Sequence, residues 1–516
     1  MPGDYPVPGA RPVYRKQILT TRMAISPEIP AADAADEIID RVPKKLWIGG
    51  EWLDGSEGDT LAVADPATEQ VIAEVAGASR DDVVRAIDAA EAAAPGWVAT
   101  SPRERAEILR KAFELMTQRR EELAVIISRE EGKTRAEALG EVAYAAEFFR
   151  WYSEEAARIL GSISRAPAGT NNVLVQHHPV GIALLITPWN FPAAMATRKI
   201  GPALAAGCTV ILKPASETPL TALALAEIYA EAGVPPGVVN VISSRRSSVV
   251  SETALSDDRV RKISFTGSTE VGRLLLAKAS EKIVNCSMEL GGNAPFIVLE
   301  DADMDVAVEA AMVAKMRNAG ESCIGANRFS VHRSRFEEFS TRLAEAMGQL
   351  RVGPGLEDGV DVGPLVNAET RDKVKQLVDD AVAGGARVLA GGNAPQGPGF
   401  YYEPTVITDI DPTAEIANTE IFGPVATIFV FDDEDEAVEW ANDTIYGLAG
   451  YVCGGDVARA TRLAGRIEAG MVGVNRGFIS DPSAPFGGMK QSGIGREGAQ
   501  DGIREFLETQ YLAVEW

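Results

Sequence analysis

The chain has 516 residues, an apolar content of 46% and a formal net charge of −24. This length accommodates two to four domains, or one large enzyme with interleaved lobes, and the apolar content supplies a sizeable core. The acidic balance argues against nucleic acids and anionic membranes as partners, because both bind basic surfaces. We expect most of this charge to serve solubility.

The four cysteines are too few and too scattered for a disulfide framework, and none forms a CxxC pair, so we predict neither disulfides nor a metal site. No apolar run reaches the roughly 18 residues of a membrane span. The N-terminus has basic residues but lacks the apolar core of a signal peptide. We therefore expect a cytoplasmic location.

Residues 1–43 are rich in proline, alanine and polar residues without sustained periodicity, which predicts a mobile N-terminal tail. Met23 is an alternative start, which would make the first 22 residues an extension. The segment from Lys45 to Trp52 has an apolar run, two glycines and an aromatic return, a pattern typical of a hairpin.

A second strand pair is predicted near residues 61–66 and 71–75, followed by helices from Ser79 to about Arg158. Ser79 and Ser101 each precede an acidic first turn and are predicted N-caps.

Between residues 181 and 280, apolar runs alternate with helical patterns. Continuous apolar strands joined by helices indicate a parallel sheet that is buried on both faces. Ligands of such sheets bind beyond the carboxyl ends of the strands. Several polar or small residues follow those ends and together predict a nucleotide site: Asn190, Lys213, Ser216, Gly267 and Ser268.

A second alternating segment begins near Leu290, with a strand at 294–299 and a helical pattern at 303–316. We predict an α/β fold in which a Rossmann-type parallel-sheet cofactor domain comprises residues 44–158 and 180–289. A second α/β catalytic domain would comprise residues 290–497.

Cys323 and Glu289 lie 34 residues apart, and each is close to glycines. A thiol attacks a carbonyl group only as the thiolate, so it needs a low pKa or a base nearby. The three histidines occupy no segment that resembles a catalytic loop, which favours a Cys323–Glu289 pair. The alternative is that Cys323 is a small buried apolar residue and that Glu289 merely precedes a turn.

One GxGxxG pattern spans Gly493 to Gly498. We reject it as a dinucleotide fingerprint because it follows Lys490-Gln-Ser rather than a strand, and we expect it to lie far from the parallel sheet. The segment from Thr266 to Gly272 is a better candidate, since it joins a strand to a helix whose N-terminus can face a phosphate. A plain helix cap explains that segment equally well.

Several motifs together resemble the aldehyde dehydrogenase superfamily, in the family's order and roughly its spacing, from about Lys45 to the C-terminus. Within it the chain most resembles bacterial, NADP-preferring succinate-semialdehyde dehydrogenases. The motifs are Pro188-Trp-Asn-Phe-Pro192, Lys213-Pro-Ala-Ser216, Phe265-Thr-Gly-Ser268, Glu289-Leu-Gly-Gly292, Cys323, Glu420-Ile-Phe-Gly-Pro424 and Pro485-Phe-Gly-Gly488.

The resemblance implies that Cys323 attacks the aldehyde carbon and that the Asn190 amide, with the Cys323 backbone N–H, holds the oxyanion. Hydride transfer would leave a thioester, which water activated by Glu289 hydrolyses. Glu420 and Phe422 would bind the nicotinamide half of the cofactor, and Trp189 and Lys213 the adenosine half. The full set of implied cofactor contacts is Trp189, Asn190, Lys213, Pro214, Ala215, Ser216, Gly267, Ser268, Leu290, Glu420 and Phe422.

NAD-preferring relatives carry a carboxylate three residues after the lysine, where this chain has Ser216. A hydroxyl group beside Lys213 accommodates a 2′-phosphate that a carboxylate would repel, so we predict NADP over NAD. Glu217 would oppose the phosphate if its side chain turned inward.

For the substrate, the resemblance implies that Arg198, Arg317 and Ser480 bind a distal carboxylate, such as that of succinate semialdehyde. Arg198 could instead pair with an acidic residue, and Arg317 could extend toward solvent. Arg476 departs from the family pattern and would widen the cationic region, so glutarate semialdehyde is an alternative substrate.

Many relatives have Cys-Val-Cys at the nucleophile, whereas this chain has Cys323-Ile-Gly325, which predicts the absence of a disulfide switch there. Residues 159–179 and 498–516 match family elements that join subunits into a homodimer or homotetramer. Two other classes compete with the dehydrogenase: a cofactor-independent cysteine acyl hydrolase and a non-catalytic binding protein.

Overall fold

The computed structural model describes residues 32–516. Helix α1 (Ala32–Arg41) packs against α4 and β4 through the buried side chains of Ala35 and Ile39. The sequence predicts a mobile tail through residue 43, and this is wrong for α1, whose spaced apolar residues form one buried face. Met23 and the rest of the predicted tail lie outside the described residues.

The predicted N-terminal hairpin and helices are confirmed. Strands β1 (Leu46–Ile48) and β2 (Glu51–Leu53) pair antiparallel around two glycines. Ser79 and Ser101 both form capping boxes. The remaining elements of this segment are β3 (Thr60–Ala64), β4 (Val71–Ala76), α2 (Arg80–Ala99), α3 (Pro102–Gln118), α4 (Arg120–Glu131) and α5 (Arg135–Glu155).

The first sheet has eight strands in the order β19-β11-β10-β7-β8-β9-β1-β2, and the five from β11 to β9 are parallel. Leu185 and Leu212 face a core shared with α3–α7, whereas Leu184 and Ile211 face a core shared with α2 and α8. Burial of both faces explains the unbroken apolar runs. The parallel strands are β7 (Ile182–Ile186), β8 (Thr209–Lys213), β9 (Val239–Val241), β10 (Val260–Thr266) and β11 (Asn285–Glu289).

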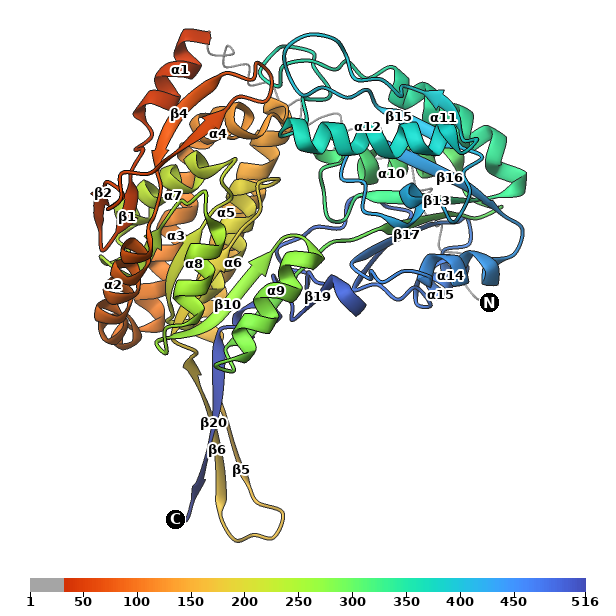
Figure 1. Ribbon diagram of the computed structural model, residues 1–516. Coiled ribbons are helices and arrows are strands. Elements are labelled where there is room, and N and C mark those ends of the chain that lie inside the picture. Colours follow the sequence, from red (N-terminus) through yellow and green to blue (C-terminus); the bar gives the residue numbers. More distant parts are fainter. Residues whose placement is uncertain (1–31) are drawn as a thin grey trace, which may run out of the picture.

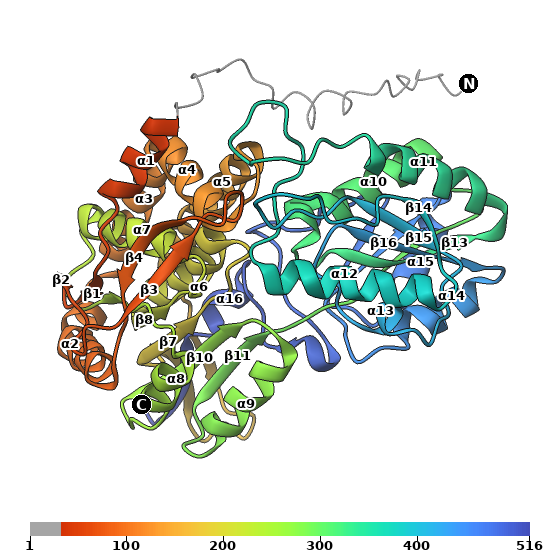
Figure 2. The same ribbon diagram turned by 45° about the horizontal axis from the view of Figure 1, so that its top comes forward.

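Four helices connect these strands, and Figure 2 shows α8 and α9 in front of β10 and β11. Their bounds are α6 (Pro192–Ala206), α7 (Pro219–Ala232), α8 (Ser247–Leu255) and α9 (Thr269–Ser280).

Strand β19 (Gly493–Ile494) is part of the rejected GxGxxG pattern, and it pairs antiparallel with Met288 and Glu289 at the edge of the first sheet. The expectation that this pattern lies far from the parallel sheet is therefore wrong. A C-terminal segment returns to the first lobe after the chain has built the second one, which periodicity does not reveal.

The second sheet has seven strands in the order β14-β15-β16-β13-β12-β17-β18, and it forms the lobe on the right of Figure 1. Its strands are β12 (Ala294–Val298), β13 (Ala326–His332), β14 (Arg387–Ala390), β15 (Thr405–Thr408), β16 (Val425–Phe431), β17 (Ala449–Cys453) and β18 (Met471–Val474). Its helices are α10 (Met304–Met316), α11 (Phe336–Gly348), α12 (Ala368–Ala383), α13 (Glu415–Asn418), α14 (Glu434–Asn442) and α15 (Val457–Ala464). Two α/β lobes with parallel strands confirm the predicted fold class.

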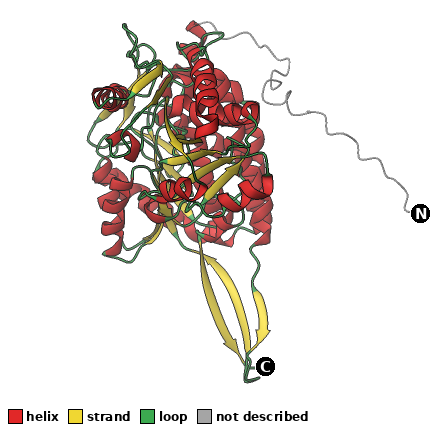
Figure 3. Ribbon diagram, turned by 90° about the vertical axis from the view of Figure 1, so that its right-hand side faces the viewer, coloured by secondary structure: helices red, strands yellow, loops and turns green. Residues whose placement is uncertain are grey.

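A three-stranded antiparallel arm projects from the first lobe (Figures 1 and 3). It contains β5 (Ser162–Arg165), β6 (Asn172–Pro179) and β20 (Leu507–Val514), with β6 in the middle, and the short helix α16 (Asp501–Arg504) precedes β20. No helix within residues 32–516 is long and apolar enough to cross a membrane.

Candidate active site

Three glycine-containing segments meet around Cys323. A Cβ added at Gly292 would collide with the carbonyl oxygen of Cys323, and one at Gly320 would collide with that of Gly423. Gly320 also has a positive φ of 78°, which side chains rarely adopt. The motifs that begin with Glu289 and Glu420 are thus packed directly on the loop that carries the thiol.

The Cys323 side chain is partly exposed at this junction of the two lobes. Burial raises the pKa of its thiol to about 12, and the nearby Arg198 and Arg317 act in the opposite direction. The carboxylates of Glu420 and Glu289 raise the pKa further. This environment disfavours the thiolate, so a reaction at sulfur needs a base or a stronger cationic influence.

Asn190 follows β7 and reaches across to the same loop. Its Nδ2 donates a hydrogen bond of 3.0 Å to the carbonyl oxygen of Glu321, two residues before Cys323. One N–H of the amide remains for another acceptor, and the buried Oδ1 has no hydrogen-bond partner among the described residues. The Asn190 amide is thus a hydrogen-bond donor held against the loop that carries Cys323.

Glu289 ends β11 and is only 3% exposed. Its Oε2 has no hydrogen-bond partner within residues 32–516, and a Cβ at Gly487 would lie 2.9 Å from its Oε1. Burial, and then the charge of Glu497, raise the pKa of this carboxyl well above its usual range, while Arg198 and Lys199 act against them. A carboxyl group with a raised pKa is suited to proton transfer near neutral pH.

Glu497 was missed by reasoning from the sequence. It lies within the rejected glycine pattern, is buried, and forms ion pairs with Arg198 and Lys199 of α6. Arg198 also stacks on Phe486, with 4.1 Å from its Cζ to the ring centroid. The ion pair corresponds to the alternative in which Arg198 is bound by an acidic residue, so this guanidinium is not a free receptor for a substrate carboxylate.

Arg317 has a different environment. Its Nη1 donates a 3.2 Å hydrogen bond to Ser480, and its guanidinium lies over the rings of Phe191 (4.6 Å) and Phe478 (4.9 Å). No ion pair of Arg317 occurs within the part of the chain that the structure describes. Of the three predicted substrate residues, Arg317 and Ser480 lie together, and the guanidinium of Arg317 has no ion-pair partner among the described residues.

The predicted cofactor residues from Lys213 to Ser216 lie at the carboxyl end of β8 in the first sheet. Lys213 is 4% exposed, and burial lowers its pKa to about 8, with Glu217 acting in the opposite direction. Ser216 donates a 3.0 Å hydrogen bond to Glu217, so the Glu217 side chain is turned toward Ser216. Pro214 and the buried Ala215 complete this turn.

The other predicted cofactor residues lie nearer the junction of the lobes. Ser268 caps α9, whereas a Cβ at Gly267 would collide with the ring of Phe265. Leu290 packs closely on Gly272. Trp189 meets Phe422 edge to face, with 5.3 Å between the ring centroids, so both rings lie at the contact between the lobes.

Glu420 accepts a 3.0 Å hydrogen bond from the backbone N–H of Gly292. Burial raises the pKa of this carboxyl to about 7. Its Oε2 lies beside Gly291, where a Cβ would come within 2.7 Å. No group of three or more His, Cys, Asp or Glu side chains in residues 32–516 is placed to hold a metal ion.

This arrangement defines an α/β enzyme with a cysteine between a nucleotide-binding type of sheet and a second α/β lobe. The model of the aldehyde dehydrogenase family matches residues 52–512. The chain therefore belongs to the aldehyde dehydrogenase family.

Three comparisons show the range of its relatives. The chain is 53% identical to a succinate-semialdehyde dehydrogenase of Paenarthrobacter nicotinovorans, over 86% of this chain and 99% of that protein. It is 47% identical to a glutarate-semialdehyde dehydrogenase of Pseudomonas putida, over 91% and 98% of the two chains. A crystal structure of an NADP-dependent enzyme of Escherichia coli is similar with a TM-score of 0.91 and 45% identity, covering 92% of this chain and 98% of that one.

Proposed function

We propose that the protein oxidises a carboxylated aldehyde, succinate semialdehyde in particular, to the corresponding acid with NAD(P)⁺. The observation that carries the choice of substrate is Arg317, a partly buried guanidinium between aromatic rings with Ser480 as its hydrogen-bond partner. A charge in such a setting is costly without an anion, and a carboxylate accepts hydrogen bonds from a guanidinium and a hydroxyl together. The Paenarthrobacter relative, by its name, acts on succinate semialdehyde.

Three side chains would carry the chemical steps. Cys323 adds to the aldehyde carbon as the thiolate, which Arg198 and Arg317 favour by lowering the thiol pKa. The oxyanion that forms accepts the free N–H of Asn190, a donor that is already held in place by Glu321. After oxidation to the thioester, Glu289 in its ionised form takes a proton from water, which then attacks the acyl carbon; the C–S bond breaks, and the acid leaves while Cys323 returns to the thiolate.

The residues of the site fit NAD(P)⁺, which would accept the hydride. Lys213 is a buried cation with no carboxylate at ion-pair distance among the described residues, so an anion or hydroxyl groups of a ligand would compensate it. Glu420 presents Oε2 beside Gly291, where ribose hydroxyl groups could donate hydrogen bonds. We propose that these two residues hold opposite ends of the cofactor.

The function is tested by comparing kcat/KM for succinate semialdehyde, glutarate semialdehyde and propanal, each with both cofactors. Reduction of the cofactor is followed at 340 nm. We expect succinate semialdehyde to be preferred over propanal. A preference for glutarate semialdehyde would assign the chain the activity named for its Pseudomonas relative. Thioester hydrolysis without any aldehyde oxidation would favour an acyl hydrolase, and binding without turnover a non-catalytic protein.

Substitution Arg317→Met should separate the two classes of aldehyde. We expect kcat/KM for succinate semialdehyde to fall roughly 10²-fold, because a charge-assisted contact to the carboxylate is lost, while kcat/KM for propanal changes little. Arg371→Met is a matched control, since Arg371 also stacks on an aromatic ring, that of Phe400, outside the site. Equal losses for both aldehydes in Arg317→Met would contradict the assignment.

We further propose that NADP is preferred, with Glu217 limiting that preference. Ser216 and Lys213 favour a 2′-phosphate, but the Glu217 carboxylate is hydrogen-bonded to Ser216 and would repel it. The Escherichia coli neighbour is described as NADP dependent.

Glu217→Gln should therefore raise kcat/KM for NADP about tenfold, the equivalent of ~1.4 kcal/mol, and leave that for NAD nearly unchanged. Titration of NADP and NAD against tryptophan fluorescence should show the same selective gain in affinity. Glu227→Gln, on the exposed side of α7, is the control for loss of one negative charge. An equal response of both cofactors in Glu217→Gln would refute a selective role.

We also propose that the arm joins subunits into a homodimer or homotetramer. Leu160 and Ile163 are 75% and 72% exposed at its base and first strand, and Tyr511 is 56% exposed on β20. Apolar side chains on a projecting sheet are costly in water and are covered when a second copy packs on them. Light scattering measures the resulting mass.

A further inference from the structure

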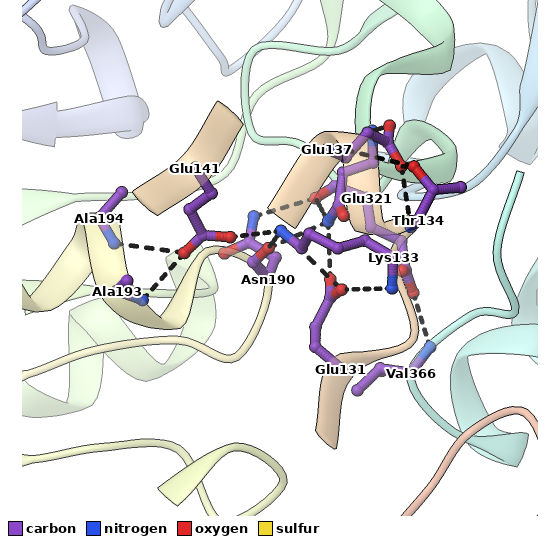
Figure 4. Close-up of polar contacts among 11 residues, drawn as sticks. Glu131, Lys133, Thr134, Glu137, Glu141, Asn190, Ala193, Ala194, Glu321 and Val366 are labelled. Atoms are coloured by element: carbon purple, nitrogen blue, oxygen red, sulfur yellow. Dashed lines mark hydrogen bonds and ion pairs between the residues drawn. The ribbon is translucent and has the colours of Figure 1, made fainter. Parts of the chain in front are cut away.

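A buried polar cluster lies against the loop that carries Cys323. The side chains around Lys133 that form this cluster are not among the predicted site residues. The turn between α4 and α5 carries Lys133, whose side chain is 1% exposed and lies among several carboxylates (Figure 4). Its Nζ donates a 2.6 Å hydrogen bond to Glu141 and lies 3.8 Å from Glu131. The run Glu130-Glu131-Gly132-Lys133 resembles a solvated helix end in the sequence, so its burial is not visible there.

Lys133 acts directly on the backbone of Asn190. Its Nζ donates a second hydrogen bond, of 2.7 Å, to the Asn190 carbonyl oxygen, and its ammonium lies 3.9 Å from the centroid of the Phe191 ring. Glu141, the partner of Lys133, accepts hydrogen bonds from the backbone N–H groups of Ala193 and Ala194. It thus caps α6, which has no capping side chain of its own.

The same carbonyl oxygen of Asn190 is bound from the other lobe by Asn318. Asn318 Nδ2 lies 3.0 Å from this oxygen and 2.7 Å from Glu131 Oε1, while the Asn318 backbone N–H donates a 2.7 Å bond to Glu137. Asn318 and the following Ala319 have φ values of 56° and 50°. Non-glycine residues in this conformation cost about 1 kcal/mol or more each, and the hydrogen bonds of Asn318 hold it there.

The loop then continues through Glu321 to Cys323. The carbonyl oxygen of Glu321 accepts from Asn190 Nδ2, and its carboxylate accepts a 3.1 Å bond from the backbone N–H of Val366. Asn190 is therefore fixed at two points, by its carbonyl oxygen and by its side-chain amide. Both points depend on the segment from Asn318 to Glu321, and the first depends also on Lys133.

We propose that Lys133 and Asn318 are positioning residues for aldehyde oxidation, which together set the placement of the Asn190 amide relative to the Cys323 backbone N–H. These two donors are the proposed oxyanion site, so the inference rests on the proposed function. Displacement of such a donor by about 1 Å can cost on the order of 10²-fold in rate. Simple alkylation of the thiol does not involve that placement. Lys213 and Glu420, the two residues proposed to hold the ends of the cofactor, form no hydrogen bond or ion pair with Lys133 or Asn318 within residues 32–516.

The test compares Lys133→Met and Asn318→Gly with the wild type in the full-length protein. Glycine readily adopts the left-handed backbone at residue 318 and removes the side-chain amide together with its Cβ, so this variant remains informative even if Lys133→Met does not fold. We measure kcat and KM for the aldehyde, the pre-steady-state burst of reduced cofactor, cofactor affinity by fluorescence, and the rate of Cys323 alkylation by iodoacetamide.

We expect kcat and the burst rate to fall 10- to 100-fold in each variant, with alkylation rate and cofactor affinity within threefold of wild type. The double variant should be at most threefold slower than the slower single variant, because both side chains act on one carbonyl group. Lys262→Met is the control: this lysine is also buried but contacts Asn285, Ser287 and Glu505, so we expect lower thermal stability with kcat retained.

Unchanged kcat in the folded variants, or a parallel loss of turnover and alkylation, would overturn the positioning role. Failure of the wild-type protein to reduce either cofactor with any semialdehyde would instead refute the proposed function.

Discussion

Cys323→Ala is expected to abolish aldehyde oxidation, with a loss on the order of 10⁴-fold or more, because none of the other three cysteines lies on the loop between α10 and β13. The variant should still bind NAD(P) with wild-type affinity, since Lys213 and Glu420 are untouched. Steady-state reduction of the cofactor and fluorescence titration measure the two properties. Because the Cys323 side chain is partly exposed, its removal should leave thermal stability nearly unchanged.

Cys286→Ala is the matched control. Cys286 lies on β11, three residues before Glu289, and burial raises the pKa of its thiol as it does that of Cys323. If iodoacetamide inactivates the enzyme by alkylating Cys323, it should still inactivate Cys286→Ala. Cys323→Ala should contain one reactive thiol fewer than the wild type. Oxidation that persists in Cys323→Ala would exclude the covalent mechanism.

The parts of the site that could be predicted from the sequence are those with a local signal. Asn190 and Lys213 follow apolar strands, and the carboxyl ends of parallel strands share one edge of a sheet, so the pattern places both residues at the same edge. Glu289 and Cys323 each adjoin glycines, and the structure explains this by the close approach of Gly292 to the Cys323 backbone. These residue types and their chain order also carried the resemblance to the family.

What the sequence does not reveal depends on contacts between distant segments. Arg198 and Glu497 are 299 residues apart in the chain, and only their ion pair shows that Arg198 is bound while Arg317 is not. The bond from Asn318 to Glu131 spans 187 residues. A charged side chain in a helix end has the same local pattern whether it is solvated or buried, so burial of Lys133 could not be predicted.

Glu289→Gln is expected to stall the enzyme after the first oxidation. The burst of reduced cofactor should approach one per active site, whereas steady turnover should fall by about 10²- to 10⁴-fold, because glutamine accepts no proton from water. The thioester that accumulates is measurable by mass spectrometry of the quenched protein. Glu505→Gln is the control, since Glu505 accepts a 2.6 Å hydrogen bond from Ser287 on the same strand but does not contact the thiol loop.

The pH dependence of thioester hydrolysis, compared between the wild type and Glu289→Gln, is a second test of the role of Glu289. Burial and Glu497 hold the pKa of Glu289 well above that of an ordinary glutamate, so its base form appears only as the pH rises. Thioester hydrolysis by the wild type should therefore increase with pH and level off above that pKa, and hydrolysis by Glu289→Gln should lack this rise. Because Arg198 and Lys199 bind Glu497 and lower the pKa of Glu289, loss of Glu497 would free both cations and move the rise to lower pH. Fast steady turnover by Glu289→Gln would show that another group activates the water.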